Sequence, residues 1–168
     1  MLSPTQRSAT MLAFGLWLVQ PPGLWAQTLV DATRPADIVE IARGFGSAHL
    51  ERDSFDDPMI LGRIDGIAYS VLFYGCEDSA HCRSIQLRAS WSPNAGITTA
   101  DMDQWNREKL FGRAYLDQDG APMLDMVVNL DGGVTLRNLD DTFDWWKVIV
   151  LEFADLLQSL SMPDPSQL

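Results

Sequence analysis

Apolar residues in the last third of the chain recur with the period of an α-helix. Between residues 139 and 160 they alternate four and three positions apart, which places their side chains on one face of a helix. Thr135 can cap this helix, and we expect it to run to about Leu160. The core-facing positions are Leu139, Phe143, Trp146, Val150, Phe153, Leu157 and Leu160.

The same helix carries more apolar residues than one buried face requires. At about 100° per residue, Trp145, Ile149 and Leu156 lie to one side of the core-facing row, and Val148 and Leu151 fall near its back. Either another subunit or a client protein covers this extra face, or the helix is buried more deeply within its own domain. The candidate partner or dimer face consists of Trp145, Val148, Ile149 and Leu156.

Alternation with a period of two predicts strands in the middle of the chain. In the clearest example Ile85, Leu87 and Ala89 alternate with polar residues, as in a strand with one solvated face. The pair Asp65-Gly66 is a tight-turn signal, so the strands on either side of it are expected to be antiparallel. The expected strands are residues 49–52, 59–64, 67–74, 84–91, 113–116 and 122–128.

Two shorter helices complete the predicted elements. Thr33 can cap the first, which begins near Pro35, and Thr98 or Thr99 can cap the second, which Gly112 ends. The apolar contacts of the second helix are expected to be Met102, Trp105 and Leu110. Together the elements predict an α+β fold in the order α-β-β-β-β-α-β-β-α, with an antiparallel meander sheet flanked by three helices.

We expect the predicted elements to form a single domain over residues 27–160. The two ends of the chain have other patterns. Residues 1–26 have the pattern of a signal peptide, with Arg7 before an apolar run and cleavage expected after Ala26. The alternative is an uncleaved anchor, although the run is short for a membrane-spanning helix. Residues 161–168 are expected to form a flexible tail.

Charge narrows the possible partners. The chain of 168 residues has 12 basic and 23 acidic residues, a formal net charge of −11, so it lacks the basic surface that nucleic acid or anionic lipid requires. With the signal pattern, this predicts an exported, periplasmic protein that has no nucleic-acid partner and no stable membrane insertion after signal cleavage.

Two cysteines lie close together in an expected loop. In an oxidising compartment, the simplest interpretation of Cys76 and Cys82 is a disulfide, which would stabilise so small a loop by about 2 kcal/mol. The alternatives are a redox pair or a metal site that also uses His81 and Asp78. Neither fits well, because the spacing is not C-x-x-C and the second ligand pair of a structural zinc site is missing.

Acidic residues gather on and beside the last predicted hairpin. An acid and base pair for hydrolysis can be drawn from Asp117, Asp119, Asp125 and Asp131, but short acids also form turns. The sequence contains no nucleophile signature, phosphate loop or calcium loop. We therefore assign no catalytic, metal-binding or cofactor-binding residue and expect no cofactor.

One basic cluster lies near the end of the middle helix. Arg107, Lys109 and Arg113 can form ion pairs within the domain, or they can bind an acidic client peptide. The sequence leaves both interpretations open.

Four segments carry a family resemblance over roughly residues 31–160. They are I-D-G-I-A-Y (64–69), F-Y-G-C with C-R-S-I-Q-L (73–87), W-N-R-E-K-L-F-G-R-A-Y-L-D (105–117) and N-L-D-G-G-V (129–134). Together they resemble the YbjN-like family of bacterial proteins, often labelled sensory transduction regulators. In that family an acid commonly stands where this chain has Val127.

The resemblance implies a fold like that of type III secretion chaperones, which are often dimeric and bind protein, and it supplies no catalytic residues. We therefore expect a non-enzymatic, exported module that binds a protein or peptide client and forms a homodimer, with a chaperone-like or regulatory role in the bacterial envelope. The alternatives are a hydrolase that uses the hairpin carboxylates and a redox or metal-binding protein that uses the Cys76 to Cys82 loop.

Overall fold

The computed structural model describes residues 29–161, so the expected signal peptide and residues 162–168 of the expected tail lie outside the described residues. The described elements confirm the predicted α+β order and add two short strands, β1 before α1 and β8 before α3. In chain order they are β1 (Leu29–Val30), α1 (Pro35–Arg43), β2 (Ser47–Arg52), β3 (Pro58–Ile64), β4 (Ile67–Tyr74), β5 (Ser84–Ser90), α2 (Thr99–Glu108), β6 (Arg113–Leu116), β7 (Pro122–Asn129), β8 (Val134–Thr135) and α3 (Leu136–Ser161).

The main sheet has six strands in the order β2-β3-β4-β5-β7-β6, and every neighbouring pair is antiparallel. The chain forms a meander only as far as β5. It then passes through α2 to the edge of the sheet, forms β6, and returns as β7 between β6 and β5. The strands β1 and β8 pair separately in a two-stranded sheet.

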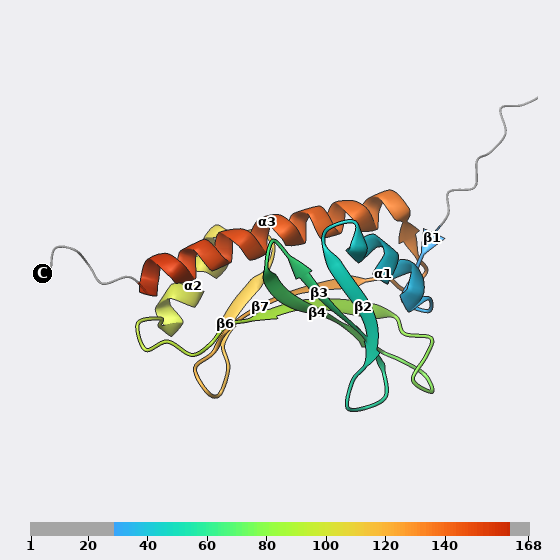
Figure 1. The fold of residues 1–168 in the computed structure, drawn as a ribbon, viewed down its shortest axis with the longest axis horizontal. Coiled ribbons are helices and arrows are strands. Elements are labelled where there is room, and N and C mark those ends of the chain that lie inside the picture. Colours follow the sequence, from blue (N-terminus) through green and yellow to red (C-terminus); the bar gives the residue numbers. More distant parts are fainter. Residues whose placement is uncertain (1–28, 162–168) are drawn as a thin grey trace, which may run out of the picture.

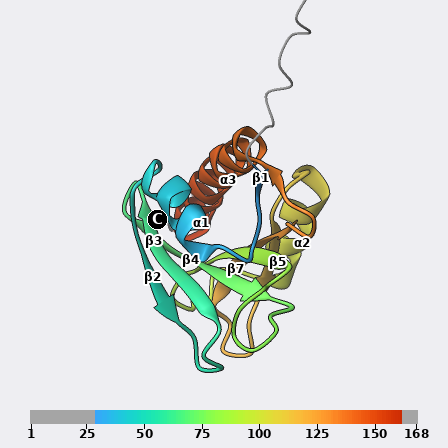
Figure 2. The same ribbon diagram turned by 90° about the vertical axis from the view of Figure 1, so that its right-hand side faces the viewer.

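All three helices lie on the same side of the main sheet (Figure 1). The long helix α3 runs across the molecule, with α1 near its beginning and α2 near its end; the end-on view shows the curved sheet beneath them (Figure 2). The opposite side of the sheet carries no helix, and we call it the open face. Although α3 has 26 residues, no helix within residues 29–161 is long and apolar enough to cross a membrane.

Helix α3 supplies the centre of the core. The hydroxyl oxygen of Thr135 accepts a hydrogen bond from the backbone N–H of Asn138 (3.1 Å), which is the predicted cap. Six of the seven predicted core positions are buried, and Leu160 is partly buried against the core. Ile149 is also buried, and Leu156 packs against the core, so deeper burial accounts for part of the extra apolar face.

Two local predictions about the shorter helices are wrong. Thr33 does not cap α1: Arg34 occupies the cap position without a side-chain hydrogen bond, and the hydroxyl of Thr33 donates to Asp31 instead. Leu110 is not an apolar contact of α2, because the helix ends at Glu108 and Lys109 adopts an extended backbone. Leu110 is therefore 89% exposed.

Candidate functional site

The structure joins Cys76 and Cys82 in a disulfide, as the sequence predicts. The loop between them is held further by an ion pair between Arg83 and Glu77 (2.7 Å). Within residues 29–161, no group of three or more His, Cys, Asp or Glu side chains could hold a metal ion. This loop is therefore a structural connection between β4 and β5, held by the disulfide and the ion pair.

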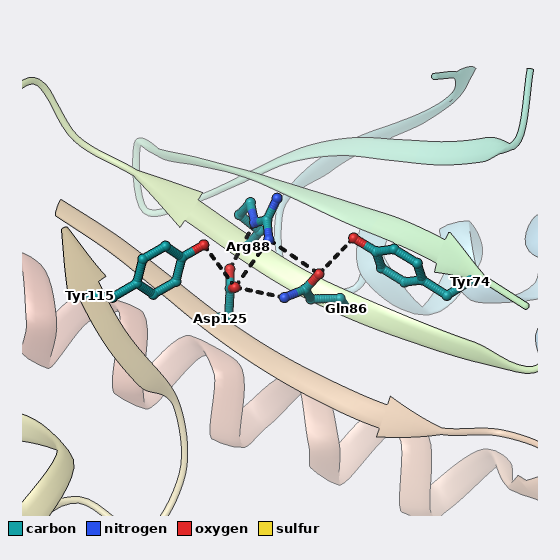
Figure 3. Close-up of polar contacts among 5 residues, drawn as sticks. All are labelled: Tyr74, Gln86, Arg88, Tyr115 and Asp125. Carbon is teal, nitrogen blue, oxygen red and sulfur yellow. Dashed lines mark hydrogen bonds and ion pairs between the residues drawn. The ribbon is translucent and has the colours of Figure 1, made fainter. Parts of the chain in front are cut away.

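A polar network crosses the open face of the sheet, centred on Asp125 of β7 (Figure 3). Asp125 is only 4% exposed, and its Oδ1 accepts a hydrogen bond from Arg88 Nε (2.8 Å). Its Oδ2 accepts from Gln86 Nε2 (2.6 Å), from a terminal nitrogen of Arg88 (3.1 Å) and from the Tyr115 hydroxyl (3.0 Å). The Tyr74 hydroxyl extends the network by donating to Gln86 Oε1 (2.8 Å).

Strand register brings these residues together. Arg88 of β5 stands directly opposite Asp125 of β7, while Gln86 lies two residues along β5 on the same face. Tyr115 reaches Asp125 from β6 on the other side. The hydrogen bonds to Asp125 raise the pKa of the Arg88 guanidinium, and burial together with the hydrogen bond to Asp125 raises the pKa of Tyr115.

Two of the four hairpin carboxylates, Asp117 and Asp125, have structural partners. Asp125 accepts four hydrogen bonds and is buried, which leaves its carboxylate little access to a substrate. Asp117 Oδ1 accepts from the backbone N–H groups of Asp119 (2.9 Å) and Ala121 (2.8 Å), which is the turn interpretation of that residue. The geometry of these acids therefore supports a role in folding.

The three residues of the predicted basic cluster engage different neighbours. Lys109 Nζ forms an ion pair with Glu152 of α3 (2.8 Å) and lies 5.2 Å from the centre of the Trp105 ring. The guanidinium of Arg113 lies over the ring of Tyr115 on the open face (4.9 Å). Arg107 makes no ion pair with any residue in the range 29–161.

An exposed apolar patch lies where the α2–β6 loop meets α3. The rings of Phe111 and Trp145 are 5.0 Å apart between centroids, yet the residues remain 39% and 47% exposed. Val148, one turn along α3, is 47% exposed, and Leu110 precedes Phe111 in the loop. We call Leu110, Phe111, Trp145 and Val148 the aromatic patch. Trp145 and Val148 belong to the predicted partner face, whereas Phe111 and Leu110 were missed because the helix was expected to include them.

Gly112 allows the loop to approach α3. Its φ of +76° lies in the left-handed region, and a Cβ at this position would lie 2.7 Å from Ile149 Cδ1. The indole N–H of Trp105 donates to the Gly112 carbonyl (3.0 Å), which fixes the loop against α2. The patch is therefore held in place by the core beneath it, including the buried Ile149.

The chain matches a known protein family. The YbjN family model, described as "Putative bacterial sensory transduction regulator", matches residues 35–159. This range extends from the first residue of α1 to within two residues of the end of α3. No curated protein matches the chain significantly. The family description is that of a regulator and names no enzymatic activity.

Proposed function

The chain belongs to the YbjN family, and from this premise we propose that it is a non-enzymatic module that binds a protein or peptide client in the bacterial envelope. The aromatic patch carries the proposal. Contiguous exposed apolar side chains on a soluble domain are typical of interaction sites, and aromatic residues are enriched at such sites.

The way the patch is built supports this role. Phe111 comes from a loop and Trp145 from the long helix, and the two rings pack on each other while keeping large exposed areas. The backbone that carries Phe111 is held close to α3 at Gly112, and the backbone that carries Trp145 belongs to a helix whose other face is buried. A patch fixed in this way would lose little conformational entropy when a partner binds, which favours affinity.

Location in the envelope is supported by two independent features. The disulfide between Cys76 and Cys82 is of a kind that persists in oxidising compartments. The first 26 residues have the pattern of an export signal. A regulator in this compartment would act through its bound partner, since the carboxylates of Asp117 and Asp125 and the two cysteines are committed to structural contacts.

Site-specific photo-crosslinking tests the proposal. A photoreactive phenylalanine analogue replaces Trp145 in the full chain, and the matched control places it at Phe55, an exposed aromatic residue (82%) in the loop between β2 and β3. We expect a discrete adduct with another polypeptide from position 145 and none from position 55.

The adducts also separate the possible occupants. Mass spectrometry of the 145 adduct distinguishes a client protein from a second copy of this chain, which would make the patch a homodimer face. Absence of any adduct at position 145, or the same set of adducts from both positions, would contradict the proposed binding function.

A further inference from the structure

A groove between α2 and α3 adjoins the aromatic patch. It encloses about 490 Å³, and its walls carry the carboxylates of Asp101, Glu108, Glu152 and Asp155 together with the ammonium group of Lys109. Leu156, which is partly buried, contributes apolar surface. Four acids and one base give the groove a formal charge of −3.

Two of the four acids are available to a ligand. Lys109 is already paired with Glu152 (2.8 Å), and Asp101 accepts hydrogen bonds from the backbone and hydroxyl of Thr98 at the start of α2. The Glu108 carboxylate accepts only from the neutral Gln104 amide (2.9 Å), and the Asp155 side chain has no hydrogen bond or ion pair within residues 29–161.

The groove and the patch share one face of α3. Trp145, Val148, Glu152, Leu156 and Ser159 follow one another at spacings of three and four residues, so they lie along the same side of the helix. From residue 145 to residue 159 this face is roughly 21 Å long at 1.5 Å per residue. It is apolar at the Trp145 end and acidic beside α2.

We propose that this face binds a basic amphipathic helix of a partner protein. The inference rests on the proposed binding function and defines the chemistry of the client. Apolar residues of the partner helix would pack on Phe111, Trp145 and Val148, and its Lys or Arg residues would approach Glu108 and Asp155. A helix of about 14 residues matches the length of the face.

Charge argues against the two other occupants. An acidic peptide would meet the carboxylates of the groove, whose single lysine is already paired with Glu152. A second copy docked about a two-fold axis through the groove would bring two grooves of charge −3 together, which is repulsive.

Synthetic peptides provide the test with the full-length protein. Three helical 16-residue peptides carry leucine at the same i, i+3, i+4 positions, and their polar positions are lysine, glutamine or glutamate. Fluorescence anisotropy measures the dissociation constant of each. We expect the lysine peptide to bind about ten-fold more tightly than the glutamine peptide. Its affinity should fall as the salt concentration rises, because salt screens the attraction between its lysines and the groove carboxylates.

Charge-neutralising variants assign the effect to the groove. The double variant Glu108→Gln and Asp155→Asn should weaken binding of the lysine peptide about five-fold, since exposed pairs contribute modestly. The control Asp119→Asn and Asp131→Asn changes the net charge equally at acids that make no side-chain ion pair in the described chain, and it should leave binding unchanged.

Equal affinity for the three peptides, no binding of any of them, or equal effects of the two double variants would overturn the inference. Self-association of the protein that is lost in the Glu108 and Asp155 variant would also overturn it and assign the face to a second copy. Failure of the proposed function is separate, because it would appear as the absence of a crosslinked partner at Trp145.

Discussion

Replacing Asp125 with asparagine should destabilise the domain by about 2 to 3 kcal/mol. Asparagine keeps one acceptor for Arg88 but places an NH₂ donor where Asp125 Oδ2 accepts from Gln86, Arg88 and Tyr115. Removing one partner of a buried ion pair costs about 3 to 5 kcal/mol. The Arg88 side chain is 32% exposed and can be partly solvated by water once unpaired, so we place the loss below that range.

Urea denaturation followed by circular dichroism measures this loss as a lower transition midpoint with an unchanged slope. The control is Asp119→Asn, an exposed turn residue with no side-chain ion pair within residues 29–161, for which we expect a change below about 0.5 kcal/mol. If Asp125→Asn were as mild as the control, the network would not be a major source of stability, and the reasoning would be refuted.

Three further changes test other parts of the fold. The hydroxyl of Tyr69 is buried without a hydrogen-bond partner among the described residues, so Tyr69→Phe should stabilise by about 1 kcal/mol at neutral pH. Burial raises the pKa of Tyr69 from 10.0 to about 12, because the folded state favours the neutral phenol. Ionisation of this group therefore leaves the free energy of unfolding unchanged below pH 10 and lowers it as pH rises from 10 to about 12. Tyr69→Phe should remove that part of the alkaline fall in the denaturation midpoint. The side-chain amide of Asn106 forms hydrogen bonds with both the N–H and the carbonyl of Ala114 (2.8 and 2.9 Å). Asn106→Ala should therefore lower the free energy of unfolding by about 1 to 2 kcal/mol and speed amide exchange in β6. Unchanged exchange would contradict the idea that Asn106 holds this strand in place. Changing Cys76 and Cys82 to serine should cost about 2 kcal/mol by thermal or urea unfolding, and loss of the whole fold would show that the bridge does more than close a small loop.

The elements themselves could be predicted because their signals are local. Asp65 and Gly66 both have positive φ, 47° and 88°, as the tight turn between β3 and β4 requires. Thr98 and Asp101 exchange hydrogen bonds in a capping box at the start of α2. Turn and cap chemistry depends on a few neighbouring residues, so a single sequence reveals it.

The site was less predictable because it depends on contacts between distant segments. The sequence indicated that Arg113 could form an ion pair within the domain, and Arg113 does stand opposite Asp125. The ion pair nevertheless forms with Arg88 on the other neighbouring strand. Only the strand order, with β7 between β5 and β6, brings Arg88 to that carboxylate, and hydrophobic periodicity contains no information about strand order.

The aromatic patch was missed in part for a related reason. The apolar pattern of α2 continues to Leu110, but the helix ends two residues earlier and the chain turns toward α3 at Gly112. The pairing of Phe111 with Trp145 joins positions 34 residues apart in the sequence. Periodicity identified the helical half of the patch and could not identify the residues that a loop adds to it.

The polar network and the aromatic patch are connected through β6. This edge strand has only four residues and pairs with β7 alone, so few backbone contacts hold it. Tyr115 ties it to Asp125 on the open face, and Asn106 ties Ala114 to α2. Because β6 begins directly after Gly112, the position of this strand determines where Phe111 meets α3. The pair of Arg88 and Asp125 on one side of the sheet thus helps to fix the aromatic patch on the other.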